Sequence, residues 1–456
     1  MAYSLLRRVV STAQILLVVG LHRKRRKEDR GGRNNAMEAQ PPSIPPTPVT
    51  EIGSLVRAVE AERAGRYVDA WHEALKAIAL RPFHPEAYIQ MASTAVAAGD
   101  PEAGLRAAQR ALALTPKWTT AQQVVAALER TLNAHRKQRK KANPIAWPAL
   151  PDPNRKPRLS VCMIVKNEER FLGQCLASVR DIADELIVID TGSTDRTVEI
   201  AREHGAQVGY FEWCNDFAAA RNASIARATG DWILFLDADE ELAANTKNGL
   251  LKHFQITQIA LFRLPIINSH QGESSRSFVP RLFRNISGIT FIGCVHEGVM
   301  TTMERIIEPW KLECDFGDSV IVHHGYESSI IRDRDKVQRN HDLLQKAVAE
   351  SPGEFYYHMQ LGLELGNMGK KEDSFKEYSI ALNLVEERGC KNVTPEVRET
   401  LLTQYSAYLL MDKQYIKAIE VLSGKLALNG ALTCSQLMVK ARAMVDLGKP
   451  EEALLV

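Results

Sequence analysis

Between residues 159 and 236, short hydrophobic runs alternate with amphipathic stretches, and this alternation is the clearest pattern in the chain. The hydrophobic runs predict buried strands over residues 159–165, 185–189, 207–211 and 232–236. The stretches between them predict helices over residues 170–179, 194–203 and 216–228. A repeated strand–helix order is typical of a mostly parallel, doubly wound sheet, so we predict a Rossmann-like α/β fold for this block.

Outside this block, hydrophobic residues recur at helical spacing, and small residues and prolines repeat at a period of 34 positions. The repeating pairs are Gly65 and Gly99, Ala77 and Ala111, and Pro82 and Pro116. Each unit predicts two amphipathic helices that are joined at a glycine and closed by a proline. A plain helical bundle is the alternative, but it does not explain several residue types at one period. The pattern resembles the tetratricopeptide repeat, which implies an all-α array that binds a protein or peptide partner or oligomerises.

The same pattern returns after the central block. Its units contain Leu361, Gly362, Gly369, Tyr378 and Ala381, then Tyr415 and Ala418, then Ala441, Gly448 and Ala453. The last unit stops at Val456 within its second helix, and a repeat that stops there leaves an apolar face uncovered. We therefore expect the C-terminal array to be truncated in this sequence.

These patterns divide the chain into five segments. We expect a basic, Pro-rich extension over 1–50, repeats over 51–130, a linker over 131–157, the α/β domain over 158–345 and further repeats over 346–456. The linker is first basic and then rich in proline. We expect it to extend as a solvated spacer rather than to pack, with nucleic-acid binding as the alternative.

Charge is distributed unevenly along the chain. The net charge is +3, but residues 1–36 hold nine Lys or Arg and only two acidic residues, so the remainder is mildly acidic. A mildly acidic body disfavours nucleic-acid binding. The apolar residues 9–21 are too few to span a bilayer, and no secretory cleavage site follows them. We expect a disordered extension here, with a peripheral membrane anchor as the alternative.

The seven cysteines are scattered, and none of them forms a C-x-x-C pair. This spacing argues against a disulfide scaffold and against a zinc site. Cys162 and Cys294 lie in apolar runs and are expected to be small core residues. A reducing compartment follows, so we predict a cytoplasmic protein.

Polar residues gather where the predicted strands end, in Lys166-Asn167-Glu168-Glu169, in Asp190-Thr191-Gly192-Ser193-Thr194-Asp195 and in Asp237-Ala238-Asp239. Residues i and i+2 of an extended segment point the same way. Asp237 and Asp239 are therefore expected to face one spot in the crevice where parallel sheets bind ligands. Two such carboxylates suit Mg²⁺ or Mn²⁺ against a diphosphate. The alternative is a solvated acidic turn at the start of a helix.

The glycine pattern limits the choice of ligand. The chain has neither G-x-G-x-x-G after a strand nor a Walker loop, so dinucleotide and P-loop functions lack their sequence signals. A nucleotidyltransferase also combines a Rossmann-like sheet with metal-binding carboxylates, but such enzymes carry a Gly-rich loop after the first strand. Lys166-Asn167-Glu168-Glu169 is not such a loop, which disfavours that class.

Together, these motifs resemble family 2 glycosyltransferases of the GT-A fold. The matching stretches are residues 159–169, Ile189 to Asp195, Phe217 to Asn222 and Leu236 to Glu240. Further downstream, Pro280 to Arg284, Val295-His296-Glu297 and His323-His324-Gly325-Tyr326 resemble a subgroup. That subgroup includes lipopolysaccharide-core glucosyltransferases and repeat-fused enzymes that glycosylate peptides or proteins. The resemblance spans about residues 158–345.

The resemblance implies a role for each matching residue. Asp190 would contact the nucleotide base, and Asn167 and Glu168 would line the nucleotide pocket. Arg221 would lie near the base or the diphosphate. Asp237 would face the ribose and the metal, and Asp239 would ligate the metal directly. Of the two histidines, His323 is the expected metal or diphosphate contact, with His324 second, and Arg281 and Arg284 are candidates for an anionic ligand.

Inverting transfer also needs a general base that removes the acceptor proton. Glu297 is our candidate and Asp318 the second choice, and each has the alternative of an ordinary surface acid. We expect a metal-dependent, inverting glycosyltransferase that uses a nucleotide-diphospho sugar, with a UDP-hexose or UDP-N-acetylhexosamine favoured. The acceptor would be a glycan, a lipid-linked molecule or a protein or peptide. The alternative function is a non-enzymatic repeat scaffold with a degenerate central domain.

Overall fold

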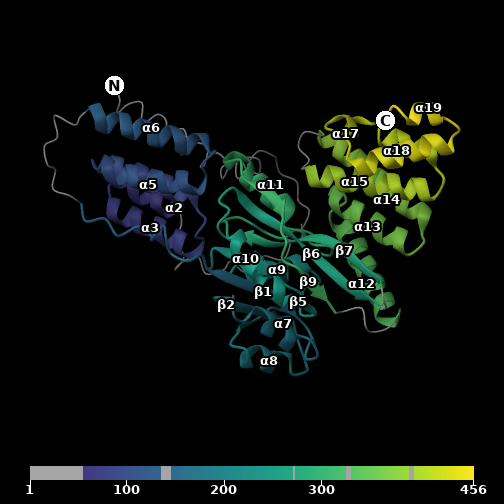
Figure 1. Cartoon of the computed structure of the whole chain (residues 1–456), viewed down its shortest axis with the longest axis horizontal. Coiled ribbons are helices and arrows are strands. Elements are labelled where there is room, and N and C mark those ends of the chain that lie inside the picture. Colours follow the sequence, from purple (N-terminus) through teal and green to yellow (C-terminus); the bar gives the residue numbers. More distant parts are fainter. Residues whose placement is uncertain (1–54, 135–144, 271–272, 325–329, 390–394) are drawn as a thin grey trace, which may run out of the picture.

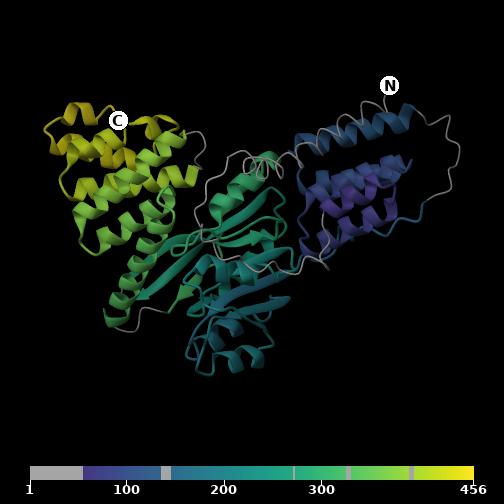
Figure 2. The same ribbon diagram turned by 180° about the vertical axis from the view of Figure 1, so that it is seen from behind.

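The computed structural model describes residues 55–134, 145–270, 273–324, 330–389 and 395–456. An N-terminal helical array, a central α/β domain and a C-terminal helical array follow one another along the chain (Figure 1). The two arrays flank the central domain on opposite sides, as the view from behind also shows (Figure 2). The predicted extension over residues 1–50 lies outside the described residues.

The N-terminal array consists of paired helices. They are α2 (Leu55–Arg63), α3 (Tyr67–Leu80), α4 (Pro85–Ala97), α5 (Pro101–Leu114) and α6 (Thr119–Ala134). The two glycines of the 34-residue period lie in the turns between helices and have positive φ values, 73° at Gly65 and 85° at Gly99. Only glycine adopts that backbone without steric cost, which explains the repeat signal at these positions. Alanines such as Ala74, Ala107 and Ala111 are fully buried where the helices meet.

The linker prediction needs correction. Helix α6 continues to Ala134, and the described part of the Pro-rich segment packs along the N-terminal array. The Trp147 ring lies 4.7 Å from that of Trp71, and the Trp147 indole N–H donates to Asp100 Oδ2 at 2.9 Å. Trp71 in turn donates to the carbonyl oxygen of Pro148 at 2.9 Å. Proline prevents helix formation here, but the aromatic residue between the prolines attaches the segment to the array.

The first half of the central domain is the predicted alternation. Its strands are β1 (Leu159–Val165), β2 (Glu185–Asp190), β3 (Gln207–Tyr210) and β4 (Trp232–Phe235), and its helices are α7 (Leu172–Val179), α8 (Thr197–Glu203) and α9 (Phe217–Ile225). The strands are parallel, in the order β3-β2-β1-β4. Alternate residues of β1 point to opposite faces: Val161 and Met163 pack with α7, and Cys162 packs toward α9.

The second half extends the same sheet. It contributes β5 (Glu240–Leu242), β6 (Ile259–His270), β7 (Glu273–Arg284), β8 (Glu313–Phe316) and β9 (Ile321–His323). It also contains η1 (Ala244–Thr246), α10 (Lys247–His253), α11 (Met300–Ile307) and η2 (Glu308–Trp310). Strand β7 runs antiparallel to β4, and the whole order is β3-β2-β1-β4-β7-β6-β9-β5, with β8 beside β6. The predicted GT-A α/β fold is confirmed, with an antiparallel strand next to β4.

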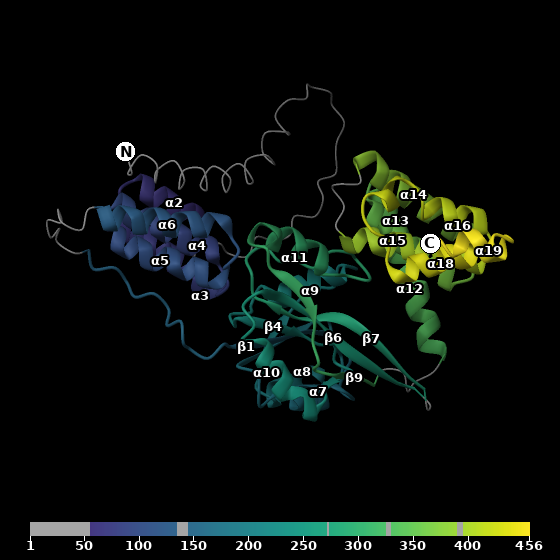
Figure 3. The same ribbon diagram turned by 45° about the horizontal axis from the view of Figure 1, so that its top comes forward.

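The C-terminal array begins with α12 (Ile330–Glu350), a helix that crosses the predicted domain boundary at residue 345. The remaining helices are α13 (Phe355–Asn367), α14 (Lys371–Arg388), α15 (Pro395–Met411), α16 (Tyr415–Val421), α17 (Lys425–Leu428), α18 (Cys434–Asp446) and α19 (Pro450–Ala453). In the turned view, α12 extends downward from the other helices of the array (Figure 3). A Cβ atom on Gly362 would lie 3.0 Å from the Tyr378 ring, so this glycine lets α13 and α14 approach closely.

Both arrays contact the central domain through side chains. On the N-terminal side, the Phe83 and Trp118 rings lie 5.8 and 6.5 Å from that of Trp310. On the C-terminal side, Val295 packs with residues of α12 and α13 in one buried cluster. Within the described residues, every helix is too short or too polar to cross a bilayer.

Candidate active site

The loops that follow β1 and β2 are tied together at the carboxyl edge of the sheet. The Asn167 amide donates to Ser193 Oγ at 2.9 Å, and Asn167 Oδ1 accepts from the Thr194 amide at 2.8 Å. The Glu168 amide donates to Thr197 Oγ1 at 2.7 Å. The parallel pairing of β1 with β2 explains this contact, because Val165 lies opposite Asp190 and the two loops begin side by side.

Asp190 lies at the centre of these loops, and only 3% of its surface is exposed. Its Oδ2 accepts from the amides of Gly192 and Ser193 at 3.1 and 3.2 Å. Gly192 has a φ of 108°, which lets the chain fold back over the carboxylate. The structure thus brings Asn167, Glu168 and Asp190 together, and it turns the Asp190 carboxylate toward its own loop.

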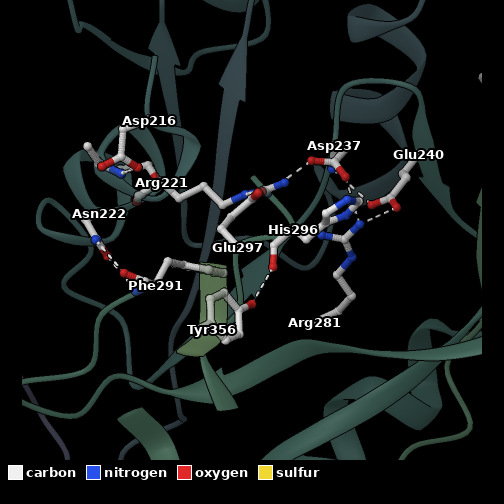
Figure 4. A network of polar contacts seen from close by, with 12 residues as sticks. Asp216, Arg221, Asn222, Asp237, Glu240, Arg281, Phe291, His296, Glu297 and Tyr356 are labelled. Carbon is white, nitrogen blue, oxygen red and sulfur yellow. Dashed lines mark hydrogen bonds and ion pairs between the residues drawn. The ribbon is translucent and has the colours of Figure 1, made fainter. Parts of the chain in front are cut away.

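A second group of charged residues surrounds Asp237, just after β4 (Figure 4). Asp237 Oδ1 accepts from Arg221 Nη1 at 3.1 Å, and Asp237 Oδ2 accepts from Arg281 Nη2 at 2.8 Å. Arg281 Nη2 also donates to Glu240 Oε1 at 2.5 Å. Glu240 Oε2 accepts from the amide of Asp237 at 3.0 Å, which closes the turn. Each arginine therefore holds two acidic groups, because Arg221 also pairs with Glu297.

These ion pairs control the protonation of the group. Burial opposes ionisation of Asp237, but the guanidinium groups of Arg221 and Arg281 outweigh it and hold its pKa well below the usual range. Burial raises the pKa of Glu240, and the neighbouring charge of Asp237 acts in the same direction. The pKa of Arg281 is raised despite burial, because Glu240 and Asp237 stabilise its cation. Asp237 is therefore a carboxylate at neutral pH, and Arg281 is charged.

Arg221 projects from α9 toward this group. Asp216 caps the start of α9 by accepting from the Ala219 amide at 3.0 Å. The guanidinium carbon of Arg221 lies 4.0 Å from the centre of the Phe235 ring. The next residue, Asn222, exchanges two hydrogen bonds with the backbone of Phe291, at 2.8 and 3.0 Å. These contacts attach the loop that leads to Glu297 to the helix that carries Arg221.

Glu297 is brought to the site from 60 residues beyond Asp237. Its Oε1 accepts from Arg221 Nε, and its side chain is 9% exposed. The loop that carries it is closed by a pair of backbone hydrogen bonds of 3.0 Å between Ile292 and Gly298. Glu297 and Asp237 thus contact different nitrogens of the Arg221 guanidinium, Nε and Nη1 (Figure 4). This places our candidate base inside the charged group, which sequence spacing does not reveal.

Asp239 and His323 form an adjacent pair. Asp239 Oδ2 lies 3.1 Å from His323 Nε2, and the two side chains are 28% and 25% exposed. The antiparallel pairing of β5 with β9 explains this contact, because Glu240 lies opposite His323. Within the described ranges, no three His, Cys, Asp or Glu side chains converge as a metal-binding group. Asp239 and His323 together offer one carboxylate and one imidazole, which suit Mn²⁺ if the ligand and water supply the other positions.

Other candidates lie elsewhere. Arg284 is buried and donates to the carbonyl oxygens of Ile259 and Ile256 at 2.8 Å each, so its proposed anion-binding role is wrong. Asp318 is exposed and lies 3.1 Å from His253 on α10, which does not support it as the base. The His324 side chain contacts Glu241, with Nε2 at 3.1 Å from Oε2, and not the Asp239 carboxylate. Gly325 and Tyr326 of the same motif lie outside the described residues.

Sequence reasoning missed two parts of the site. The sequence pattern identifies Glu240 only as part of the acidic motif, although Glu240 is 3% exposed and shares Arg281 with Asp237. A carboxylate inside a strand-end motif gives no sequence signal for burial. The contacts of the C-terminal array with His296 were also missed, since they join residues that are 60 and 68 positions apart.

The comparisons with known proteins concern the family of the central domain. Residues 160–305 match the family model described as "Glycosyl transferase family 2". A TPR repeat-containing protein of Synechococcus elongatus is 39% identical over 208 residues, which cover 45% of this chain and 51% of that protein. The glycosyltransferase SunS of Bacillus phage SPbeta is 30% identical over 232 residues, covering 50% and 54%. These matches support a family 2 glycosyltransferase domain beside helical repeats, as predicted.

The chain spans about half the length of these relatives. Among solved structures, it resembles glucosyl-3-phosphoglycerate synthase from Mycobacterium tuberculosis in complex with Mn²⁺ and uridine-diphosphate-glucose. The two are 18% identical with a TM-score of 0.31, and the match covers 41% of this chain and 77% of the other.

Proposed function

We propose that this protein transfers a hexose or N-acetylhexosamine from a nucleotide-diphospho sugar, with a UDP-sugar favoured, to an acceptor hydroxyl or thiol with inversion at the anomeric carbon. The observation that carries the proposal is the position of Arg221, which pairs with Asp237 through Nη1 and with Glu297 through Nε. One guanidinium thus joins the residue expected beside the donor to the residue expected beside the acceptor.

The two arginines suit a departing diphosphate. As the bond from the anomeric carbon to the diphosphate oxygen breaks, negative charge collects on the leaving group. Arg221 and Arg281 lie on the two oxygens of Asp237, and their side chains are only 11% and 10% exposed. Charges held in such a sheltered place act more strongly than charges in water, because the surrounding dielectric constant is lower.

Asp239 and His323 would hold the divalent cation, Mn²⁺ or Mg²⁺. When bound, the cation would neutralise diphosphate charge as a Lewis acid. Asp237 already has an arginine on each of its oxygens. We therefore assign it to orienting Arg221 and Arg281, with the ribose as a further contact, and we assign direct metal ligation to Asp239.

Glu297 would take the proton of the acceptor group as that group attacks the anomeric carbon. The pair with Arg221 fixes one carboxylate oxygen of Glu297. Asn167, Glu168 and Asp190 would bind the nucleoside on the adjacent strand ends. A base N–H would join the Gly192 amide as a donor to the Asp190 carboxylate, which has capacity for more than one hydrogen bond.

The direct test is a thermal-shift screen of nucleotide sugars with and without Mn²⁺, followed by calorimetry and turnover with the best donor. We expect a UDP-sugar to stabilise the protein only with the cation present. Asp239→Asn should remove this effect and abolish turnover. Glu241→Gln is the matched control, because Glu241 forms a His–carboxylate pair of the same 3.1 Å length with His324 and also accepts from Gln174.

The same screen distinguishes the proposed function from its alternatives. A protein that binds no nucleotide sugar under any condition would be a scaffold, and the proposal would be wrong. Release of pyrophosphate from a nucleoside triphosphate would indicate a nucleotidyltransferase instead. Equal loss of turnover in the Asp239 and Glu241 variants would refute the metal assignment. We propose that the acceptor is a glycan, a lipid-linked molecule or a protein or peptide, and assays of the purified enzyme with each class would test this. We also propose a cytoplasmic location, which cell fractionation would test.

A further inference from the structure

The loop that carries Glu297 is held by the C-terminal array. His296 Nε2 lies 2.5 Å from Glu364 Oε1, and Glu364 is a buried residue of α13. The hydroxyl of Tyr356, also on α13, donates to the carbonyl oxygen of His296 at 2.8 Å, as drawn in Figure 4. Asn340 of α12 donates to the same Glu364 oxygen at 3.3 Å. Both the side chain and the backbone of His296 are therefore bound to the array.

Two residues of this loop have backbone conformations with a positive φ. His296 has a φ of 52°, in the left-handed region that a residue with a Cβ adopts only at a cost. Gly293, at the start of the loop, has a φ of 101°, and a Cβ there would lie 2.9 Å from Tyr356 Cε1. The backbone bridge between Ile292 and Gly298 closes the loop behind these residues. The array thus contacts the loop at both residues that have a positive φ.

Burial and charge both favour the contact between Glu364 and His296. Glu364 is 3% exposed, and a buried carboxylate needs a charged or hydrogen-bonding partner. Burial alone raises the pKa of Glu364, but the contact with His296 outweighs it and lowers that pKa. Val295 of the loop packs with Leu344, Leu361 and Leu365 of the array. A polar contact and an apolar contact therefore fix neighbouring residues of one short loop.

We propose that Glu364 and Tyr356 are positioning residues, which hold Glu297 against Arg221 by fixing His296. This inference rests on the proposed function, since it assigns the array a part in the transfer step. The array would then be a component of the active site in addition to any partner-binding role. Donor binding would not depend on it, because the donor residues lie on the strand ends of the central sheet.

The test measures turnover of the donor found in the screen, with water as the acceptor. Glu364→Ala and Tyr356→Phe should lower kcat by about 10–100-fold, the range expected when a catalytic group is misplaced by about 1 Å. The KM for the donor should change by less than about twofold, because ground-state binding is untouched. Glu377→Ala is the matched control, since Glu377 lies 2.5 Å from His358 within the same array. It should leave kcat and KM unchanged.

A double-mutant cycle separates positioning from general damage. In the Glu297→Gln background, Glu364→Ala should have little further effect, because both changes remove the same contribution. An equal fold-loss in both backgrounds, or an equal loss for Glu377→Ala, would overturn the inference. Should Glu364→Ala not fold, Tyr356→Phe carries the same test by removing one hydroxyl.

Amide hydrogen exchange of residues 292–298 gives a readout that does not need turnover. Glu364→Ala and Tyr356→Phe should raise exchange in this loop, and Glu377→Ala should not. Unchanged exchange would refute the positioning role of Glu364 and Tyr356. Wild-type protein that neither binds nor turns over any nucleotide sugar would instead overturn the proposed function, so the two failures are distinguishable.

Discussion

Replacement of Arg281 should lower the stability of the central domain through one identifiable ion-pair network. It is 9% exposed, and its Nη2 donates both to Asp237 and to Glu240. In Arg281→Leu, Asp237 keeps Arg221 as a partner. Glu240 keeps only the backbone amide of Asp237 among the contacts described above. The change therefore leaves a buried carboxylate without its countercharge.

The loss of stability that we expect follows from the unpaired charge of Glu240. Removing one partner of a buried ion pair costs about 3–5 kcal/mol, mostly because the other charge stays buried. Glu240→Gln alone should also destabilise the protein, since it removes charge from the pair. In combination with Arg281→Leu, however, Glu240→Gln should recover about 1–3 kcal/mol, because a neutral amide tolerates burial better than an unpaired carboxylate.

Arg284 provides the control on the same strand. It is 7% exposed, it donates to backbone carbonyl groups, and its guanidinium carbon lies 4.4 Å from the Trp232 ring. Burial lowers its pKa to about 10. Arg284→Leu should also destabilise the domain, but its effect and that of Glu240→Gln should simply add, since Arg284 makes no ion pair with Glu240 here.

The assay must report on the central domain separately from the helical arrays, because a multidomain chain does not unfold in one step. Hydrogen exchange of the amides of β4 and β7 under native conditions gives the opening free energy of this sheet. An Arg281→Leu variant within about 1 kcal/mol of wild type would refute the reasoning. So would additive effects of Arg281→Leu and Glu240→Gln.

Two further predictions concern the helices and the sheet. Gly362→Ala should destabilise the C-terminal array by about 1–3 kcal/mol, measured by native-state hydrogen exchange of α13 and α14, because its Cβ would press on the Tyr378 ring at 3.0 Å. Burial opposes ionisation of Glu185, but hydrogen bonds from Ser160 and Thr229 outweigh it and lower its pKa. This carboxylate should therefore stabilise the domain above its unfolded pKa of about 4.3 and less as the pH falls. Unfolding between pH 3 and 6 should be less pH-dependent in Glu185→Gln.

Periodic features were predictable from the sequence. The parallel strands and the helices between them follow from alternating hydrophobic runs, and the structure places them within a few residues of the predicted bounds. Gly65 and Gly99 were predictable as turns, because their left-handed backbone is a local requirement. The linker was not, since Trp147 packs against Trp71 across 76 positions and composition says nothing about such a contact.

The site was predictable only where its residues follow neighbouring parallel strands. Parallel strands place Asn167, Glu168 and Asp190 at one edge, and the pairing of β1 with β2 makes their loops neighbours. Glu297 reached the candidate set through family resemblance, and its contact with Arg221 depends on a loop held by distant helices. Side chains that meet across a sheet or between domains have no fixed sequence spacing, so pattern reasoning does not find them.

The separate roles that we propose for Asp237 and Asp239 follow from the charges around them. Both carboxylates come after one buried strand, and two residues of separation favour a shared cation. Asp237, however, is flanked by two guanidinium groups, whose positive charge would repel a divalent cation placed between them. Asp239 faces an imidazole, which is a metal ligand when neutral. Under the proposed function, a cation would therefore gain most beside Asp239 and His323, and Asp237 would gain most by keeping its two arginine partners.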